Sequence, residues 1–297
     1  TNLIDLMKLD VEKPGRLVDI NALDLNQIEV LPNDHIRIGA LVKNSTFAYH
    51  PEIIKRFPLI HEAILSGASA QIRNMASTGG NILQRTRCYY FYDTAFPCNK
   101  RVPGSGCSAI NGYNRIHAIL GTSDHCIATH PSDMCVALMA MDTLVLTQSP
   151  KGKRTIPFTE FYRLPGTTPQ FENVLQPGEL ITAIEIPALN FSYRSCYVKV
   201  RDRASYEFAL ASAAVALEIS KGKINQSRIA LGGVGTIPWR ASAAERELRG
   251  SEISEEVFRK AADKELATAR SRQHNAFKTE LAKRTLVRAL MTASEIA

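Results

Sequence analysis

Apolar residues recur at two different spacings along the first 190 residues, and each spacing predicts a different kind of element. Alternation with polar residues, or a short apolar run between turn residues, is typical of a β-strand. Such blocks lie at 17–20, 27–31, 36–42, 143–147, 154–158 and 180–186. Apolar residues three or four positions apart instead predict helices, which we place at 2–8, 47–66 and 134–141.

Turn-forming residues subdivide these blocks. Pro32-Asn33-Asp34 and Ser149-Pro150-Lys151-Gly152-Lys153 each join two strand blocks, so two hairpins are expected. Pro58 interrupts the longest helical block, which therefore predicts two helices. Ser132 and Asp133 precede the last helical block and are suited to cap its first turn.

The pattern changes near residue 190. Three further strand blocks are followed by two helical segments, at 192–200, 208–219, 228–234, 254–267 and 276–293. Lys221-Gly222-Lys223 is a turn between two of the strands. Meandering strands followed by helices predict a separate α+β domain, so we expect an α+β protein of two domains, 1–187 and 190–297.

Composition agrees with a globular protein of this kind. A chain of 297 residues with 45% apolar content can form two domains with a core. No run of about 18 apolar residues is present, which excludes a membrane-spanning helix. The net charge is +7, but Lys and Arg are spread along the chain without a dense basic run. We therefore expect a solvated surface or an acidic partner subunit, and no nucleic acid.

Four of the six cysteines crowd into one irregular stretch between Met75 and Asp133. They are Cys88, Cys98, Cys107 and Cys126. Their spacing matches neither the short chelate pairs of structural zinc sites nor the compact ferredoxin motif. A converging metal site and a surface loop of free thiols are therefore both open from the residues alone. Cys135 and Cys196 lie in an apolar helix and a strand, where they are expected to be core residues.

Five cations flank the clustered thiols, and we expect them to lower the thiolate pKa values and offset the charge of a bound cluster. They are Arg85, Arg87, Lys100, Arg101 and Arg115.

The two ends of the stretch carry donors and acceptors of their own. Ser77-Thr78-Gly79-Gly80-Asn81 offers backbone N–H groups, two hydroxyls and an amide, which a pyrophosphate or a flavin needs. Asp133 is suited either to cap its helix or to accept hydrogen bonds from ribose or adenine groups. His130 fits a ligand contact or a packing role equally well.

Taken together, these residues resemble the flavin subunit of the molybdenum hydroxylases, the xanthine dehydrogenase and aldehyde oxidoreductase family. Ser77-Thr78-Gly79-Gly80-Asn81 resembles the second flavin loop, and Ser132-Asp133 the Ser-Asp element after it. The segment 178–187 resembles the strand that packs on the flavin, and 197–201 the lysine strand. The first flavin loop is an Ala-Gly-Gly-Thr type motif, of which only the tail, Thr1-Asn2-Leu3, lies in this sequence.

The resemblance implies a fold and a set of cofactor contacts. The fold is a two-part FAD-binding domain of the vanillyl-alcohol-oxidase/PCMH type, truncated at its N-terminal part, before a C-terminal domain with a three-stranded antiparallel sheet and helices. The implied flavin contacts are Thr1, Asn2, Leu3, Ser77, Thr78, Gly79, Gly80, Asn81, Gln84, Thr129, His130, Ser132, Asp133, Ile181 and Lys199.

An insertion at 84–128 separates the two flavin elements and resembles the branch that holds a 4Fe–4S cluster beside FAD. The resemblance implies that Cys88, Cys98, Cys107 and Cys126 are the cluster ligands. It is nearest to the flavin subunit of bacterial periplasmic aldehyde oxidoreductases, and 4-hydroxybenzoyl-CoA reductase shares the inserted cluster.

The implied function is electron transfer within a heterotrimer. A molybdenum-cofactor subunit oxidises an aldehyde, a 2Fe–2S subunit relays electrons to FAD, and an external acceptor receives them. No residue of this chain is expected to be catalytic. We expect export to the periplasm with a signal-bearing partner, the alternative being the cytoplasm. The rival functions are a flavin subunit of a xanthine dehydrogenase or 4-hydroxybenzoyl-CoA reductase type enzyme, and a non-catalytic zinc-binding protein.

Overall fold

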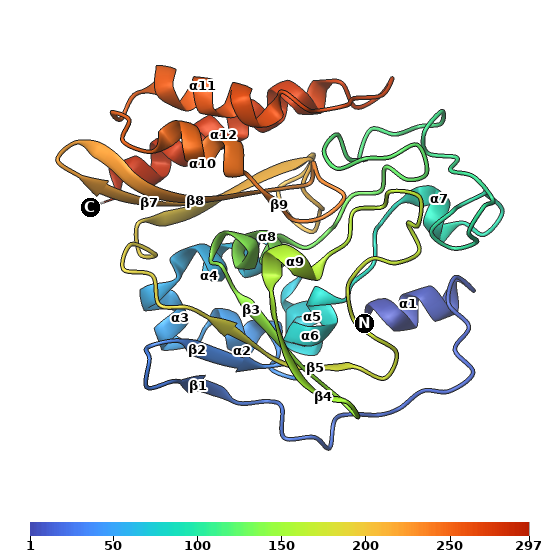
Figure 1. Ribbon diagram of the computed structural model, residues 1–297. Coiled ribbons are helices and arrows are strands. Elements are labelled where there is room, and N and C mark those ends of the chain that lie inside the picture. Colours follow the sequence, from blue (N-terminus) through green and yellow to red (C-terminus); the bar gives the residue numbers. More distant parts are fainter. Residues whose placement is uncertain (297) are drawn as a thin grey trace.

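The structure, a computed structural model, describes residues 1–296, so Ala297 at the end of the predicted C-terminal domain lies outside it. Two antiparallel sheets are stacked with helices between them and on top of the second one (Figure 1). The first sheet contains, in spatial order, β1 (Ile28–Val30), β2 (Ile36–Gly39), β5 (Leu180–Ile186), β3 (Leu144–Ser149) and β4 (Gly152–Pro157). The second contains β6 (Ser195–Val200), β7 (Ala211–Ser220), β8 (Lys223–Gly232) and β9 (Trp239–Arg240).

The helices fall into three groups. Those of the first domain's core are α2 (Asn44–Ala48), α3 (Pro51–Arg56), α4 (Pro58–Ser66), α8 (Asp133–Ala140) and α9 (Phe158–Phe161). Those that cover the outer face of the second sheet are α10 (Ser242–Leu248), α11 (Glu255–Leu266) and α12 (Phe277–Glu295). Short helices near the candidate site are α1 (Asn2–Lys8), α5 (Ala70–Met75), α6 (Thr78–Ile82) and α7 (Tyr89–Tyr92). No helix within residues 1–296 is long and apolar enough to cross a membrane.

Strand β7 is buried on both faces and joins the two cores. Val215 and Leu217 belong to the core beneath α10, α11 and α12. Ala214 and Ala216 point the other way, into the core that contains α4 and α8. Side chains alternate across a strand, and the small alanines let the helices pack closely on that face.

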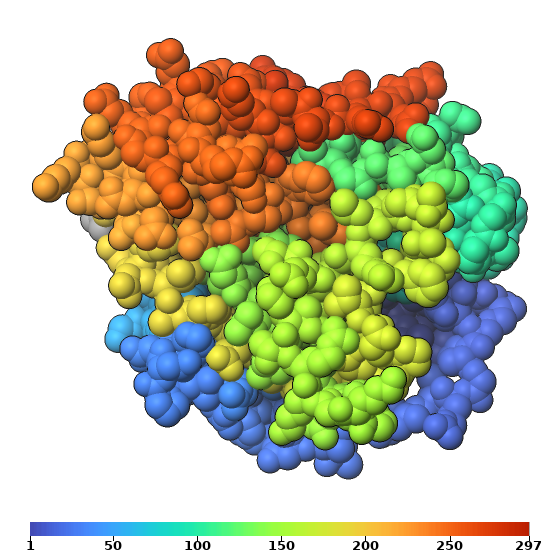
Figure 2. All heavy atoms as spheres, in the orientation of Figure 1, coloured from blue at the N-terminus to red at the C-terminus, as the bar shows by residue number. Residues whose placement is uncertain are grey.

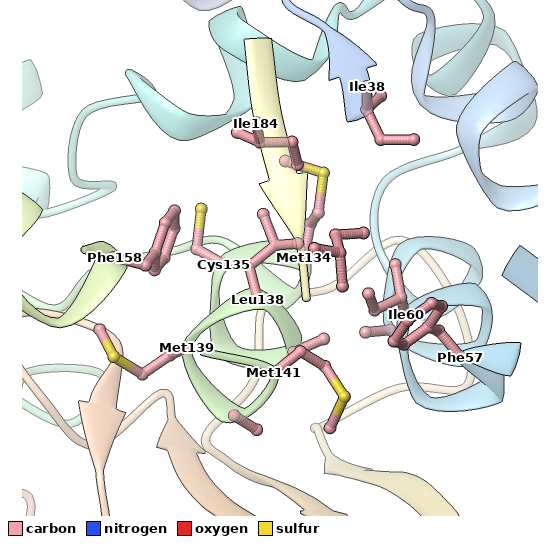
Figure 3. Close-up of a cluster of buried hydrophobic side chains, with 14 of the residues drawn as sticks. Ile38, Phe57, Ile60, Met134, Cys135, Leu138, Met139, Met141, Phe158 and Ile184 are labelled. Carbon is pink, nitrogen blue, oxygen red and sulfur yellow. The ribbon is translucent and has the colours of Figure 1, made fainter. Parts of the chain in front are cut away.

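Helix α8 is the centre of the first core. All eight of its residues, Asp133 to Ala140, are buried. Figure 3 shows Met134 and Met141 on the side of Phe57 and Ile60, with Cys135 beside Phe158. Cys135 is fully buried and Cys196 is 5% exposed, which confirms that both are core residues.

The cysteine-rich insertion is folded although it is mostly irregular. It forms one side of the surface in Figure 2, between the C-terminal domain and the N-terminal segment. Its own small core includes Cys88, Phe91 and Ile127, and Leu6 of α1 packs into it. Gly106 has φ +102° in the turn that brings Cys98 opposite Cys107, a conformation that favours glycine.

Several predicted elements differ from the structure. Residues 17–20 are not a strand, and Leu17 and Val18 are exposed, because no neighbouring strand pairs with them. The block 47–66 lies in three helices, since the chain also breaks before Pro51. The C-terminal sheet gains a fourth, two-residue strand, β9, beside the three that were expected.

Candidate functional site

The largest of three cavities around the insertion lies where the insertion, the start of α8 and the C-terminal domain meet. Its volume is about 220 Å³. Thr129, His130, Ser132 and Asp133 form one wall, and Ser212 with Gly233 contributes from the second sheet. A second cavity of about 40 Å³ shares Thr86, Thr129 and His130 with it and adds Gln84. These are five of the predicted flavin contacts: Gln84, Thr129, His130, Ser132 and Asp133.

Ser132 joins the two ends of the stretch that the insertion separates. Its hydroxyl donates a hydrogen bond of 2.6 Å to Asn81 Oδ1 and accepts one of 3.1 Å from the backbone N–H of Cys135. Ser132 is therefore the cap of α8, and it also holds α6 against α8. Asn81 Oδ1 also accepts a hydrogen bond of 2.7 Å from Gln84 Nε2, so Asn81 contacts wall residues of both cavities.

Asp133 is an ion-pair partner and not a helix cap, which corrects the capping alternative. Its carboxylate accepts hydrogen bonds from Lys199 Nζ at 2.8 Å and from the Tyr197 hydroxyl at 2.6 Å. The Asp133 and Lys199 side chains are only 8% and 4% exposed. The pair connects α8 to β6 beside the cavity. Asp133 lines the cavity, whereas Lys199 only contacts Asp133 from behind.

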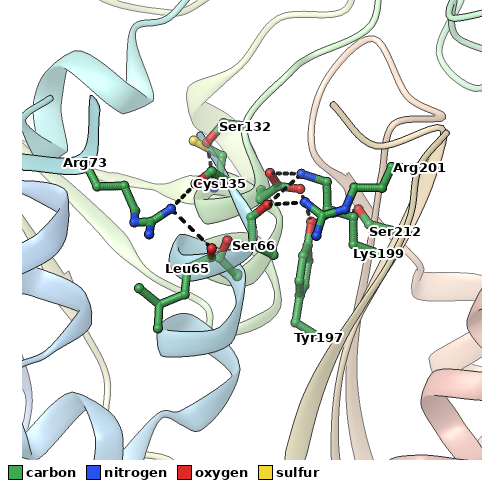
Figure 4. Close-up of polar contacts among 12 residues, drawn as sticks. Leu65, Ser66, Arg73, Ser132, Cys135, Tyr197, Lys199, Arg201 and Ser212 are labelled. Carbon is green, nitrogen blue, oxygen red and sulfur yellow. Dashed lines mark hydrogen bonds and ion pairs between the residues drawn. The ribbon is translucent and has the colours of Figure 1, made fainter. Parts of the chain in front are cut away.

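The same lysine also reaches the C-terminal end of α4. Lys199 Nζ and Arg201 Nη1 each donate to the carbonyl oxygen of Ser66, both at 3.0 Å (Figure 4). Arg73 donates to Leu65 and Gly67 from the opposite side. Cations at a helix C-terminus offset the partial negative charge of the unpaired carbonyls.

The Ser77–Asn81 segment is a helical turn whose donors are largely satisfied inside the protein. The Thr78 hydroxyl and its N–H both donate to Val42 O, and the N–H of Gly79 donates to Ala40 O. The N–H of Gly80 donates to Ser77 Oγ. The expectation that this loop offers free donors to a pyrophosphate is therefore wrong for Thr78 and Gly79 in this conformation. A Cβ at Gly80 would meet only Ser77 Oγ, at 3.0 Å.

The remaining predicted contacts lie away from the two cavities. Ile181 is 2% exposed and packs in the core of the first sheet. Thr1, Asn2 and Leu3 lie at the start of α1, next to the insertion. Asn2 fixes this position, because its side chain accepts from the N–H of Arg85 at 2.8 Å and donates to the Tyr92 hydroxyl at 3.1 Å.

The four clustered cysteines come together around a third cavity of about 10 Å³. Cys98 and Cys107 face each other across a short antiparallel bridge. Cys88 also lines the largest cavity, and Cys126 also lines the second one. Among residues 1–296, no group of three or more His, Cys, Asp or Glu is placed so that it could hold a metal ion. The thiols thus surround a common space without meeting at one point.

Burial dominates the protonation of these thiols. Desolvation raises the pKa of Cys88 to about 12 and that of Cys126 to about 11, and it also raises the pKa of Cys107. The expectation that the flanking cations lower these pKa values holds only for Lys100 and Cys126, and burial outweighs it there.

Several of these cations have partners within the protein, and Lys100 itself pairs with Glu172 at 2.7 Å. Arg85 pairs with Glu12 and Glu172, and Arg115 pairs with Asp202 at 2.7 Å. Arg101 donates to backbone carbonyl groups that include those of Tyr90 and Phe91.

Two histidines line the largest cavity with a ring nitrogen that has no protein partner. His130 Nδ1 accepts from the N–H of Ser132, while its buried Nε2 is unpaired within the described residues. Desolvation lowers the pKa of His130 to about 3 and that of His117 to about 4, so both rings are neutral. Unpaired buried polar atoms at a cavity wall are available to a bound group.

Sequence reasoning missed the cavity residues of the second sheet and of the insertion. Ser212, Gly233 and Phe208 carry no local motif, and only the stacking of the two domains brings them to α8. His117 lies inside the insertion without any metal-site spacing, although a histidine among clustered cysteines was a signal that could have been used.

Family comparison identifies the two domains. A family model described as "FAD binding domain in molybdopterin dehydrogenase" matches residues 1–189, and one described as "CO dehydrogenase flavoprotein C-terminal domain" matches residues 196–293. The protein is thus a flavoprotein built from an FAD-binding domain and a C-terminal α+β domain. It belongs to the family of FAD-binding oxidoreductase subunits of the molybdopterin dehydrogenases.

Individual relatives agree with this assignment. The chain is 49% identical over 294 residues to the aldehyde oxidoreductase FAD-binding subunit PaoB of Escherichia coli (strain K12), covering 99% of this chain and 89% of that protein. It is 28% identical to the glyceraldehyde dehydrogenase medium chain of Sulfolobus acidocaldarius, covering 89% and 76%.

A solved structure shares the fold. Carbon monoxide dehydrogenase from Hydrogenophaga pseudoflava superimposes with a TM-score of 0.74 and 26% identity, covering 98% of this chain and 86% of that one. The family resemblance and the α+β fold class are thereby confirmed.

Proposed function

We propose that this chain is the FAD- and 4Fe–4S-binding electron-transfer subunit of a molybdenum-dependent aldehyde oxidoreductase. A molybdenum-cofactor subunit and a 2Fe–2S subunit complete the heterotrimer, and an external acceptor takes up the electrons. FAD exchanges electrons singly or in pairs, and a 4Fe–4S cluster exchanges them one at a time. The chain positions both groups and tunes their surroundings.

One observation carries the cluster part of the proposal: four thiols far apart in sequence surround one cavity beside the candidate flavin site. A tetrahedral zinc ion needs sulfur atoms about 2.3 Å from a single point, and no such group exists within residues 1–296. A 4Fe–4S cluster is a larger body held by four cysteine thiolates, which suits ligands spaced around a volume.

The walls of the larger cavity support the flavin part. At about 220 Å³ the cavity is below the range of roughly 300–1,000 Å³ for whole ligand sites. It would therefore enclose one portion of a dinucleotide, and the rest would lie outside. Ser132, Thr129 and His130 would hydrogen-bond that portion, while Asp133 and Lys199 hold the wall in place.

The substrate class and the partners rest on similarity. A relative whose printed name is aldehyde oxidoreductase FAD-binding subunit is 49% identical along nearly the whole chain, which supports an aldehyde as the substrate of the molybdenum subunit. Within this proposal the flavin domain spans 1–187 with the cluster insertion at 84–128, and the C-terminal domain begins at 190. The assembly is exported to the periplasm with its signal-bearing partner.

A cysteine series tests the cluster assignment. Replacing Cys88, Cys98, Cys107 or Cys126 by Ser in the assembled enzyme should lower iron and acid-labile sulfide, because each change removes a thiolate ligand. Cys135→Ser is the matched control, since Cys135 is equally buried but lies in α8. Equal iron loss at Cys135, or full iron in the other variants, would contradict the ligand set.

A further inference from the structure

His117 contacts one of the four clustered cysteines directly. Its Nε2 lies 3.0 Å from Cys88 Sγ, and the side chain is buried. Resting on the cluster proposed above, we propose that His117 donates a hydrogen bond to the Cys88 sulfur and thereby raises the reduction potential of the bound cluster.

The position of the ring proton follows from the surroundings. His117 Nδ1 is buried and has no hydrogen-bond partner within residues 1–296. A proton on Nδ1 would leave an N–H donor buried and unpaired, which is costly. A proton on Nε2 instead points at the sulfur, which as a thiolate ligand only accepts. The tautomer with the proton on Nε2 is therefore the one that satisfies the site.

The C-terminal domain fixes the backbone of this histidine. The carbonyl oxygen of His117 accepts hydrogen bonds from Lys278 Nζ at 3.1 Å and from Asn275 Nδ2 at 3.3 Å. Its own N–H donates to Asn114 O at 3.0 Å. The ring centroids of Tyr89 and Tyr90 lie 6.4 and 6.3 Å from that of His117. The ring is held in place and cannot easily turn away from Cys88.

The electrostatic consequence has a definite sign. A reduced cluster carries one more negative charge than an oxidised one, so an N–H donor at a ligand sulfur stabilises the reduced form more. Cys88 and His117 both line the largest cavity as well as contacting each other. His117 is thus a positioning residue, and its effect falls on the cluster ligand that borders the flavin site.

The test compares three variants of the assembled enzyme. His117→Phe removes the donor, His117→Gln retains an amide N–H, and His274→Gln replaces an exposed histidine that lines none of the three cavities. Iron content is measured first, and the cluster potential is then determined by a titration followed by electron paramagnetic resonance. His117→Phe should shift the potential to a more negative value, His117→Gln should shift it less, and His274→Gln should leave it unchanged.

Each outcome decides the matter. Wild-type enzyme with no iron beyond that of its 2Fe–2S subunit would overturn the proposed function and this inference together. A cluster with unchanged potential in His117→Phe would overturn the inference and leave the proposed function standing. Loss of the cluster from both His117 variants would mean a merely structural histidine and would also overturn it. Loss from His117→Phe alone, with a near-native potential in His117→Gln, would support the hydrogen bond.

Discussion

The ion pair between Asp133 and Lys199 is a buried link between the two domains at the candidate flavin site. Both side chains are almost fully buried, and Tyr197 adds a hydrogen bond to the carboxylate. A buried charge is tolerated only when it is paired, so neither residue can be removed alone without cost. The pair thus supports the wall formed by Ser132 and Asp133.

Lys199→Met should lower the free energy of unfolding by about 3–5 kcal/mol, because it leaves Asp133 charged, buried and without its cation. Urea unfolding measures this. The double variant Lys199→Met/Asp133→Asn should recover most of the loss, since an amide still accepts from Tyr197. A single variant as stable as wild type would show that the pair contributes little.

At the scale of single residues, the sequence shows which chemical groups are present but not their contact partners or their burial. The hydrogen-bonding capacity of Asp133 could be noticed from the sequence, but its two partners lie 64 and 66 positions away. The thiol pKa values were misjudged for a related reason. Charge is visible in a sequence, whereas burial, which raises the pKa of Cys88, is a property of the fold.

Helix α8 is connected to the candidate site through its N-cap residue, Ser132. Ser132 caps the helix and also donates to Asn81 of α6. Ser69 provides a comparison, because it caps α5 by accepting from the N–H of Ile72 at 3.3 Å.

Ser132→Ala should lower stability by about 0.5–2 kcal/mol, as expected for a lost cap, and should also lower FAD occupancy because α6 is released from α8. Ser69→Ala should lower stability by a similar amount and leave FAD occupancy unchanged. Occupancy is measured from the ratio of flavin to protein absorbance. Equal occupancy in the two variants would remove the Ser132–Asn81 contact from the flavin site.

Elements were predictable where local signals and tertiary packing agree. The hairpins β1–β2 and β3–β4 form where alternating residues flank a turn. Helix α6 was missed because Thr78, Gly79 and Gly80 are poor helix formers, and the turn is instead held by bonds to Val42 and Ala40. The predicted strand at 17–20 fails because nothing pairs with it.

At the scale of the whole molecule, the insertion is held between the two domains by a buried lysine. Lys278 of α12 donates to the carbonyl oxygens of Ile116 and His117 in the insertion and of Gly233 in the second sheet. Burial lowers the pKa of Lys278 to about 7. One side chain therefore links the C-terminal helix, the second sheet and the loop that carries the cysteines.

The lowered pKa of Lys278 predicts that the free energy of unfolding depends on pH. The folded pKa of Lys278, about 7, lies below its unfolded value of 10.5, so the unfolded state binds more protons between these values. The contribution of Lys278 to stability should then rise as the pH increases from about 7 towards 10, by at most about 1.4 kcal/mol per pH unit.

Urea unfolding of wild type and Lys278→Met at pH 7.5 and 9.5, with reductant present, measures this contribution. The free energy of unfolding of wild type minus that of Lys278→Met should be larger at pH 9.5 than at pH 7.5. Lys151→Met, at an exposed turn, should show no such trend. A difference that stays constant with pH would contradict the lowered pKa of Lys278.

The central claim is that this chain carries both a flavin and a 4Fe–4S cluster, with the cluster in the insertion. Quantifying FAD, iron, acid-labile sulfide and zinc in anaerobically purified enzyme, assembled with its partners and as the separated flavin subunit, tests it most directly. The separated subunit should contain FAD together with iron and sulfide in the ratio of a 4Fe–4S cluster. A subunit with FAD but no iron or sulfide, or with zinc in their place, would contradict it.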